Sequence, residues 1–417
     1  MSELSYLEKL LDGVEVEWKP LKDVCDFKNG FAFKSSLFKE TGLPIVRITN
    51  IDGFNVDLDE VKYFSLNDYK EDLSSFEVSM GNILIAMSGA TTGKVGIYKK
   101  GTKCYLNQRV GKFIPKENIL NNNYLYHFLL LNTETIYILA GGGAQPNLSS
   151  NALMSKLLIP IPCPDNPEKS LAIQSEIVRI LDKFTALTAE LTAELNMRKK
   201  QYSYYRDQLL TFKEGEVEWK ALGEIGEVRM CKRILKSQTS SEGEIPFYKI
   251  GTFGKEPDSY ISRKLFNEFK EKYSYPKVGE VLISASGTIG RTVIFDGRES
   301  YFQDSNIVWI ENNEKIVLNK YLFYFYKIAK WGISEGGTIK RLYNDNLRKL
   351  MIPVPFPDSP ERSLVEQQKI VKLLDKFDAL TNSITEGLPR EIELRQKQYE
   401  YYRDLLFSFP KPDTVSN

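Results

Sequence analysis

Residues 159–188 read IPIPCPDNPEKSLAIQSEIVRILDKFTALT, and residues 352–381 read IPVPFPDSPERSLVEQQKIVKLLDKFDALT. The second stretch repeats the first 193 positions later and keeps the proline pattern, the Pro-Asp pair and the Leu-Asp-Lys-Phe run. An internal repeat sets the architecture of a chain, so it is the first feature to interpret. The sequence therefore predicts two copies of one structural frame.

Further repeats extend this frame in both directions. Residues 13–24 read GVEVEWKPLKDV and return as GEVEWKALGEI at 215–225, while QYSYYRD at 201–207 returns as QYEYYRD at 398–404. The inserts between these blocks, about 19–158 and 220–351, agree poorly. We interpret a duplicated frame with two divergent inserts as one scaffold that presents two different recognition surfaces.

Length and composition limit the class of protein. The 417 residues suffice for two or more domains, and 42% hydrophobic and 27% charged content is ordinary for a soluble globular chain. No signal peptide and no run of about 20 apolar residues is visible. The four cysteines are scattered and His127 is the one histidine, which argues against a zinc site and favours a reduced, cytoplasmic setting. The sequence predicts no membrane partner.

The net charge of +1 is low for an isolated DNA-binding domain. Either the basic groups gather on one face, or a partner supplies further basic surface.

The two inserts carry matching strand signals. Apolar runs at 43–48, 82–87 and 94–98 correspond to runs at 245–250, 280–285 and 292–295, and helical patterns follow at 123–139 and 319–329. Short strands broken by glycine, together with one or two helices, predict a compact α/β module in each insert.

A long helix is predicted after each insert. Residues 172–212 contain no proline or glycine, and their apolar residues recur at spacings of three and four, which is typical of a coiled-coil seam. The predicted seam residues are Ile177, Ile180, Phe184, Leu187 and Leu191 in the first helix and Ile370, Leu373, Phe377, Leu380 and Ile384 in the second. Two such stripes most simply pack together, and Gly387, Leu388 and Pro389 are expected to kink or interrupt the second helix.

The first helix contains the tandem TAELTAEL at 188–195, with Thr188, Leu191, Thr192 and Leu195 as its repeated positions. The counterpart region, which includes NSITEGLPREI, is four residues longer, and four helical residues span about 6 Å. The chain start, 6–18, also resembles 205–219, so a helix ending at about 409 could meet residue 1. We therefore predict a mixed α/β fold in which two similar globular domains are separated by two long antiparallel coiled-coil helices, with a cyclic, pseudo-two-fold arrangement.

The predicted domain boundaries follow from the repeats. They are 1–18 for a segment that closes the repeat, 19–158 for the first recognition domain, 159–214 for the central helical region, 215–351 for the second recognition domain, 352–409 for the C-terminal helical region, and 410–417 for a disordered tail.

A glycine-rich loop recurs in both inserts. SGATTGKVG at 88–96 matches SGTIGRTV at 286–293, and each follows an apolar strand. Backbone amides in such a loop can approach phosphate closely, and Lys94 or Arg291 adds charge. The spacing is one residue short of a Walker A motif. The alternative is an ordinary turn that requires glycine.

Two further segment pairs match in position but differ in polar groups. GGGAQPNLS at 141–149 corresponds to GGTIKRLYN at 336–344, and YLNQR at 105–109 to YFQDS at 301–305. Asparagine and glutamine can bond adenine edges, while lysine and arginine suit phosphate or guanine. Two different sequence readers require such differences, although drift in exposed loops would also produce them.

The candidate DNA-binding residues come from these loops and nearby bases. They are Lys34, Arg47, Ser88, Thr91, Thr92, Lys94, Gln108, Arg109, Gln145 and Asn147 in the first insert, and Lys232, Arg233, Lys249, Thr288, Arg291, Lys340 and Arg341 in the second.

The repeated YYRD blocks are candidate docking sites for partner proteins, because aromatic residues beside charges favour interfaces. They contribute Tyr204, Tyr205, Arg206, Tyr401, Tyr402 and Arg403. Closure of the coiled-coil core is an equal alternative, and both roles are compatible.

Sequence motifs for catalysis are missing. We find no adenine-methyltransferase motif of the NPPY type, no glycine-rich cofactor fingerprint, no nuclease arrangement of the PD-(D/E)xK type and no paired-carboxylate constellation. We therefore predict no catalytic residue and no metal site in this chain.

Two variable blocks that alternate with two repeated helical blocks resemble the specificity (S) subunit of Type I restriction–modification systems, and the TAEL tandem resembles the type IC branch. The stretches 159–202 and 391–412 carry the resemblance most strongly, and it covers the whole chain. It implies that the inserts are target recognition domains, each reading half of a split double-stranded DNA site through the major groove. It also implies helices that set the spacer and dock two methyltransferase (M) subunits, which methylate adenine.

The resemblance further implies motor-nuclease (R) subunits as partners, with S-adenosylmethionine, ATP and Mg bound by partner subunits. Two alternatives stay open at this point. One is a self-contained DNA methyltransferase or nuclease with degenerate motifs, and the other is a coiled-coil scaffold without a role on DNA.

Overall fold

The computed structural model describes residues 6–11, 13–142, 146–213, 215–332, 341–383 and 385–410. The chain divides into two compact units, each described here by itself. Unit 1 comprises Met1–Glu190 and Ile392–Asn417, and unit 2 comprises Leu191–Glu391. The first part of helix α6 (Pro167–Leu209) belongs to unit 1 and the rest to unit 2, whereas α12 (Gly387–Leu406) begins in unit 2 and ends in unit 1.

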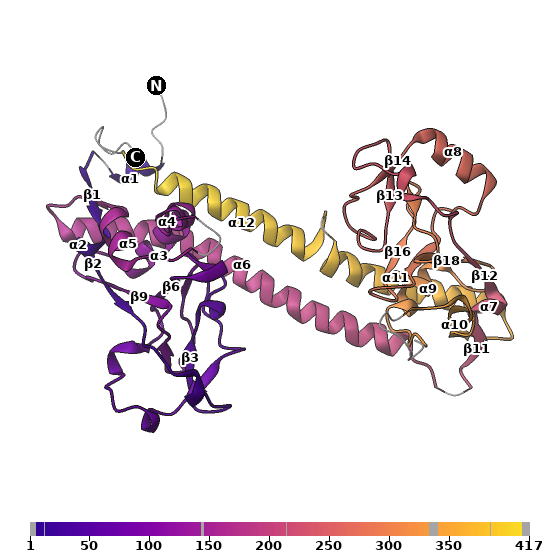
Figure 1. Cartoon of the computed structure of the whole chain (residues 1–417), viewed down its shortest axis with the longest axis horizontal. Helices are drawn as coiled ribbons and strands as arrows, with labels where there is room; N and C mark the ends of the chain where they lie inside the picture. The colour runs from indigo at the N-terminus through magenta and orange to yellow at the C-terminus, as the bar shows by residue number, and fades with distance from the viewer. Residues whose placement is uncertain are drawn as a thin grey trace. The chain divides into compact units, whose positions relative to one another are not determined.

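Unit 1 contains two four-stranded sheets and a two-stranded ribbon (Figure 1). The sheet orders are β2-β9-β6-β7 and β4-β3-β8-β5, and the ribbon pairs β1 with β10. The strands are β1 (Val16–Pro20), β2 (Cys25–Asn29), β3 (Leu43–Val46), β4 (Lys62–Phe64), β5 (Glu77–Val78), β6 (Ile83–Ala86), β7 (Val95–Ile97), β8 (Cys104–Leu106), β9 (Val110–Pro115) and β10 (Leu158–Pro162). The α-helices are α1 (Tyr6–Leu11), α2 (Leu21–Val24), α3 (Asn122–Leu131), α4 (Thr133–Leu139) and α5 (Ser150–Lys156). Short 3-10 turns are η1 (Ser35–Leu37), η2 (Ile48–Asn50), η3 (Leu66–Asp68), η4 (Ser74–Phe76) and η5 (Gly89–Thr91).

Unit 2 repeats this plan. Its sheets have the orders β12-β18-β15-β16 and β14-β13-β17, and its ribbon pairs β11 with β19. The strands are β11 (Val217–Ala221), β12 (Gly226–Arg229), β13 (Ile245–Tyr248), β14 (Tyr260–Ile261), β15 (Val281–Ser284), β16 (Thr292–Ile294), β17 (Tyr301–Phe302), β18 (Ile307–Asn312) and β19 (Met351–Pro355). The helices are η6 (Lys236–Gln238), α7 (Leu222–Ile225), α8 (Arg263–Lys272), α9 (Asn319–Tyr326), α10 (Asn344–Arg348) and α11 (Pro360–Asn382). The mixed α/β fold, with two β-rich regions and long helices that pack together, is as predicted.

The proline-rich stretch that opens each repeat forms one strand of the ribbon. Trp18 on β1 lies opposite Pro160 on β10, and Trp219 on β11 lies opposite Pro353 on β19. In each unit a buried tyrosine hydroxyl donates to the proline carbonyl, at 2.9 Å from Tyr124 and 3.0 Å from Tyr321. The carbonyls of these repeated prolines therefore hold the ribbon against α3 in unit 1 and against α9 in unit 2.

A buried glutamine attaches each long helix to its module. The Gln174 carboxamide accepts from the Asn121 N–H and donates to the Ile119 carbonyl and to the Ser170 hydroxyl. Gln367 makes the same three bonds with Leu318, Ile316 and Ser363. These contacts repeat at equal positions, as expected for two copies of one frame.

Aromatic rings stack between the long helices inside each unit. Phe184 on α6 stacks on Tyr402 of α12 with ring centroids 5.1 Å apart, and Phe377 on α11 lies 5.6 Å from Tyr205 of α6. The predicted seam is only partly buried, because Leu187 and Leu373 are exposed while Leu181 and Leu374 are fully buried. Ile177 and Ile370 are buried as predicted, whereas Leu181 and Leu374 are each buried one position after the predicted Ile180 and Leu373. Each helix turns these buried residues toward the core of its own module. Ile384 lies outside the described residues.

Several expected helix bounds differ in the structure. Residues 123–139 form two helices, α3 and α4, because the Asn132 amide bonds the Phe128 carbonyl between them. The second long helix is interrupted earlier than predicted, around Ser383, whose hydroxyl accepts from the Thr385 and Glu386 N–H groups. Residues 387–389 instead form the first turn of α12, where proline costs no helical hydrogen bond. That helix ends at Leu406 rather than near 409.

The described residues nearest the two chain ends, Tyr6 and Pro410, belong to unit 1. Leu7 and Leu11 of α1 share a core with Leu406, Phe407 and Phe409. The Trp18 indole N–H donates to the Pro410 carbonyl at 2.8 Å. These contacts support the predicted cyclic closure, and the predicted tail beyond residue 410 lies outside the described residues.

His127 of α3 links α12 to the first long helix, α6, through a polar network. Its Nδ1 lies 2.9 Å from the Tyr399 hydroxyl and its Nε2 lies 2.8 Å from Asp182, which also accepts from Asn123. Burial raises the pKa of Asp182, but the bonds from His127 and Asn123 outweigh it, so this pKa lies below its ordinary value.

A depressed carboxylate pKa makes stability depend on pH. The charged Asp182 stabilises unit 1 above its ordinary pKa of about 4, and this contribution is lost as the pH falls through the lower folded-state pKa. We expect Asp182→Asn to lower the urea midpoint at pH 7, and the difference from the parent chain to shrink toward pH 3. A difference that stays constant with pH would contradict this role for Asp182.

Candidate nucleic-acid interface

Three segments of unit 1 meet where β6 ends. The Met87 N–H donates to the Arg109 carbonyl at 2.8 Å, and the Leu148 N–H donates to the Met87 carbonyl at 2.8 Å. Ser88 and Asn147 form an antiparallel bridge. We call residues 88–94, 107–109 and 146–148 the reader end of unit 1.

The glycine-rich loop is held tightly at this reader end. The Thr92 hydroxyl lies 2.7 Å from the Gly89 carbonyl and 3.1 Å from the Pro146 carbonyl, while the Gly89 N–H donates to Pro146 at 3.3 Å. Gly89 has φ +79°, a conformation that glycine adopts without strain. By contrast, the Ser88 and Thr91 hydroxyl oxygens are buried without a hydrogen-bond partner among the described residues.

These two adjacent threonines allow a matched test of the loop. We expect Thr92→Val to lower the free energy of unfolding by about 1–2 kcal/mol, because carbonyl oxygens lose their donor. Thr91→Val should leave it within about 0.5 kcal/mol, since no bond is lost. Urea unfolding of both variants measures the difference, and equal destabilisation would show that the Thr92 bonds do not hold the loop.

Unit 2 builds the same arrangement with different side chains. The Ala285 N–H donates to the Asn306 carbonyl at 2.7 Å, and the Leu342 N–H donates to the Ala285 carbonyl at 2.8 Å. Ser286 and Arg341 form the matching antiparallel bridge. We call residues 286–291, 304–306 and 341–342 the reader end of unit 2.

The structure shifts the pairing that the sequence suggested. Asn147 corresponds to Arg341, and Arg109 corresponds to Asn306 rather than to Ser305. Unit 2 has one residue more between β17 and this point, and Ser305 takes φ +52° there. Asn306, whose carboxamide accepts from the Ser286 hydroxyl at 2.8 Å, was therefore missed as a candidate.

The basic side chains of the two reader ends are held differently. Arg291 donates to the Phe253 carbonyl at 3.0 Å, and Arg341 to the Ser305 carbonyl at 3.3 Å. In unit 1 the exposed side chains of Lys94, Gln108 and Arg109 have no bond or ion pair with any other described residue. Unit 2 therefore orients its arginines in advance, whereas the polar groups of unit 1 are free to adapt.

Other candidates lie beside the reader ends. Arg47 precedes η2, which packs against η5. The Arg47 Nη2 donates to the Glu60 carbonyl at 3.5 Å, whereas the Arg47 Nε is buried and has no hydrogen-bond partner in the part of the chain that is described. Its counterpart Lys249 forms an ion pair with Asp258 at 2.8 Å. Arg233 lies 4.0 Å from Asp304, and Thr288 is exposed within the loop.

Two candidates lie away from the reader ends, and two more lie outside the described residues. The Lys34 N–H donates to the Tyr69 hydroxyl, and the Lys232 ammonium lies 5.1 Å from the Tyr273 ring centroid. Gln145 and Lys340 lie outside the described residues.

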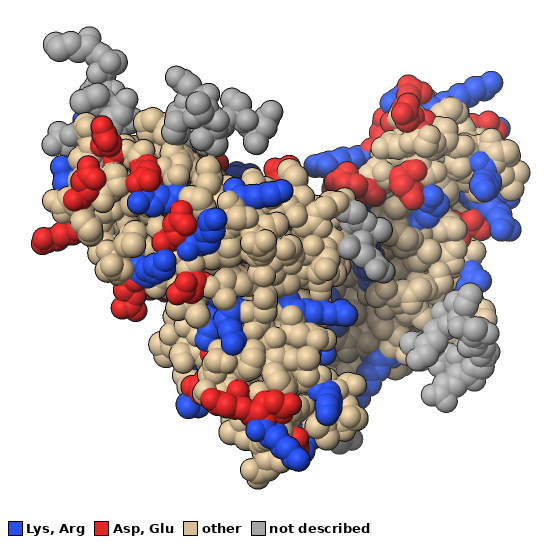
Figure 2. Space-filling model, turned by 60° about the vertical axis from the view of Figure 1, so that its left-hand side comes forward, with Lys and Arg blue, Asp and Glu red and all other residues tan. Residues whose placement is uncertain are grey.

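Charge is not segregated on the face that Figure 2 shows, where Lys and Arg side chains alternate with Asp and Glu. No group of three metal-ligating side chains occurs in the described part of the chain. Helices long and apolar enough to cross a membrane are likewise absent from the described ranges.

The fold and the paired reader ends define a duplicated recognition protein, and comparison with known proteins identifies its family. The family model for the Type I restriction modification DNA specificity domain matches twice, at residues 13–198 and 214–394. The chain therefore belongs to the specificity subunits of Type I restriction–modification systems, with two target recognition domains.

Individual relatives match over their full length. The chain is 51% identical to a putative type I restriction enzyme specificity subunit of Haemophilus influenzae, covering 97% of this chain and 98% of the relative. It is 42% identical to the EcoR124I/EcoR124II specificity subunit of Escherichia coli, covering 100% of both. The crystal structure of an S subunit from M. genitalium shares the fold, with a TM-score of 0.57, 16% identity, and coverage of 96% and 98%.

A specificity subunit is a non-catalytic component of its complex. It assembles with M and R subunits on DNA, and those subunits bind the cofactors. Membership of the family therefore decides against the two alternatives left open by the sequence, an independent enzyme and a scaffold without a role on DNA.

Proposed function

We propose that the two reader ends each read one half of a bipartite, asymmetric DNA site through the major groove. The proposal rests on one observation: the two reader ends have the same backbone arrangement but carry different side chains. The same three segments meet in each unit, but their side chains differ. Unit 1 has Asn147 at the position of Arg341 in unit 2, and Arg109 at the position of Asn306. One fold that presents two sets of polar groups suits two different half-sites.

The side chains suit different base edges. The Asn147 carboxamide can make two bonds with adenine, and the Arg341 guanidinium can make two with guanine. Lys94 and Arg291 follow the glycine-rich loops and suit phosphate, which positions a protein without reading sequence. We assign the other candidates in and beside the reader ends to these two roles.

We propose that the long helices set the unread spacer. The TAEL tandem, with Thr188, Leu191, Thr192 and Leu195, lies within the unbroken helix α6. Helix length changes in steps of about 1.5 Å per residue, so insertion or loss of one tetrapeptide changes the spacer in a defined step.

We also propose that the exposed tyrosines of the YYRD blocks dock two M subunits that methylate adenine. Tyr204 is 62% exposed and Tyr401 is 64% exposed, whereas Tyr205 and Tyr402 are less exposed, at 44% and 39%, and stack on Phe377 and Phe184. Arg206 and Arg403 are largely buried, and they lie over the rings of Tyr202 and Tyr399. The outer tyrosine of each pair therefore serves docking, and the inner tyrosine and the arginine hold it in place.

R subunits would complete a cytoplasmic restriction complex, with S-adenosylmethionine, ATP and Mg bound outside this chain. The domain boundaries predicted from the repeats are part of the same proposal.

Alanine variants of the two equivalent residues test the half-site assignment. We expect Asn147→Ala, in a complex with M subunits, to relax one position in one half-site, and Arg341→Ala to relax one position in the other half. Each true base contact should account for about 1–3 kcal/mol of discrimination. Sequencing the methylated products of a randomised duplex library gives the readout, with Lys103→Ala as a control. Relaxation of the same half-site by both variants would refute the assignment.

A further inference from the structure

Unit 2 has an apolar groove whose counterpart in unit 1 is covered. The groove has a volume of about 550 Å³, and its floor and walls include Phe212, Trp219, Phe325, Ile328 and Met351. Trp219 is 49% exposed and Met351 is 43% exposed.

The equivalent residues of unit 1 are less exposed. Trp18 and Leu158 are half-buried, and Phe409 is buried where Phe212 is half-buried. The chain itself covers this surface in unit 1, since Pro410 accepts from the Trp18 indole and α1 adds Leu7 and Leu11 to the same core. In unit 2 the chain turns away instead before β11, where the Glu216 N–H donates to the Lys213 carbonyl and the Lys213 N–H donates to the Glu216 carboxylate.

The charges around the groove indicate what it can bind. Lys330 and Lys349 line it, and no acidic residue is found among the described residues of its wall. In unit 1 the covering helix α1 buries Leu7 and Leu11 in the core. A groove with an apolar floor and two lysines is complementary to an amphipathic helix that has carboxylates beside its apolar face.

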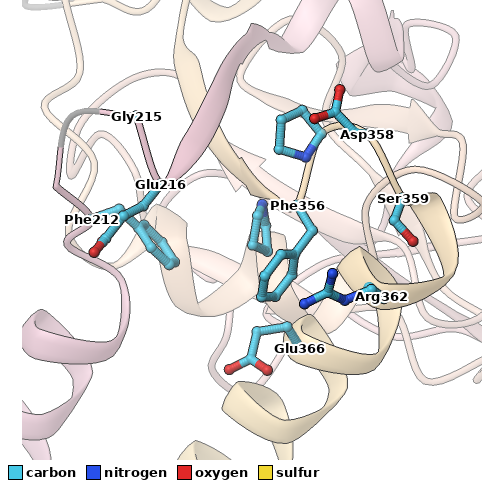
Figure 3. Close-up of a pocket in the computed structure, with 10 residues that line it drawn as sticks. Phe212, Gly215, Glu216, Phe356, Asp358, Ser359, Arg362 and Glu366 are labelled. Atoms are coloured by element: carbon cyan, nitrogen blue, oxygen red, sulfur yellow. The ribbon is translucent and has the colours of Figure 1, made fainter.

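A second cavity, which Phe212 also lines, carries acidic side chains. Its volume is about 550 Å³. Figure 3 shows Glu216, Asp358 and Glu366 among the residues that line it, together with Arg362. The Arg362 guanidinium lies 4.4 Å from the Phe356 ring centroid. Three carboxylates would repel an acidic helix, so its binding would be confined to the Trp219 side.

We propose that the Trp219 groove binds a short acidic amphipathic helix of an M subunit. The apolar residues of that helix cover Trp219, Phe212 and Met351, and its carboxylates face Lys330 and Lys349. This inference rests on the proposed assembly with M subunits, but it concerns a surface separate from the exposed tyrosines. Because unit 1 covers its own counterpart, the contact is made by unit 2 alone.

A photocrosslinker tests this occupant directly. The assembled complex is prepared with p-benzoylphenylalanine in place of Trp219 and, as a control, in place of the exposed Val278. Irradiation should join position 219, but not position 278, to an M subunit peptide with leucine-like residues at helical spacing and at least two carboxylates. Assembly without this crosslink, or a crosslink to a second copy of the chain, would overturn the groove proposal while leaving assembly intact. Failure to assemble with the unmodified chain would overturn both.

Charge reversal provides a second measurement. Lys330→Glu with Lys349→Glu should raise the dissociation constant for M subunits by about tenfold or more, because carboxylates would face carboxylates. Lys264→Glu on α8 is the matched control and should leave the constant unchanged. Equal constants for the double variant and the control would contradict the proposed chemistry.

Discussion

Removal of Thr192–Leu195 from α6 is expected to shorten the preferred DNA spacer by about one base pair. Four helical residues span about 6 Å, and only the component of this length along the duplex counts against about 3.4 Å per base pair. The half-sites themselves should stay unchanged, because the reader ends lie outside the deletion. Selection of methylated products from randomised duplexes, with the reconstituted complex, measures both the spacer length and the half-site sequences.

A length-preserving variant controls for local damage to the helix. Thr192→Ala with Ala193→Gln keeps four residues and a good helical sequence, so the spacer should equal that of the parent chain. An unchanged spacer after the deletion would refute the role of α6 in setting it. A changed half-site would instead show that the helix influences base reading.

Gln174→Ala and Gln367→Ala are expected to give the largest losses of stability, about 3–5 kcal/mol each. Each glutamine is fully buried and satisfies a backbone N–H, a backbone carbonyl and a serine hydroxyl. Removing such a group leaves several buried polar atoms without partners. Hydrogen exchange should localise the effect, with faster amide exchange in unit 1 for Gln174→Ala and in unit 2 for Gln367→Ala.

Gln368→Ala provides the matched control, because Gln368 is the exposed neighbour of Gln367 on α11. Its unfolding free energy should change by about 0.5 kcal/mol or less. If the three variants were equally stable, the buried glutamines would not be what attaches the helices to their modules.

The strands and long helices could be predicted because their signals are local. The apolar runs before Ser88 and Ser286 form β6 and β15, and the stretch without proline or glycine forms most of α6. The repeat itself predicted the shared frame, since identical prolines make identical contacts in both ribbons. Gln174 and Gln367 also recur at the same place in both repeats, each four residues after a serine. This recurrence indicated a shared buried contact, but the sequence analysis did not use it.

Other features depend on contacts that a single sequence does not display. The positive φ of Ser305 moves Asn306 into the place of Arg109, and no turn motif marks that step. The interruption near Ser383 comes from a hydroxyl that bonds two amides, which competes with the helix just before the glycine. The exposure of Trp219 arises because the chain turns away there, although its neighbours in sequence match those of Trp18.

The sequence predicted which loops contain the candidate site, but not which of their residues lie together in space. Ser88, Thr92, Arg109 and Asn147 do lie together in unit 1, whereas Lys34 does not join them. Bases such as Lys34 and Lys232 were chosen for charge alone, and charge does not specify where a side chain lies.

Exchange of one insert tests the central claim most directly. Residues 19–158 of this chain would be replaced by the aligned segment of the Haemophilus influenzae relative, and the methylated sites of a host carrying the chimera would be sequenced against those of the parent. Two independent readers on one frame predict a split motif in which one half changes while the other half stays the same. Replacement of both halves, or a motif that is not split, would contradict the account.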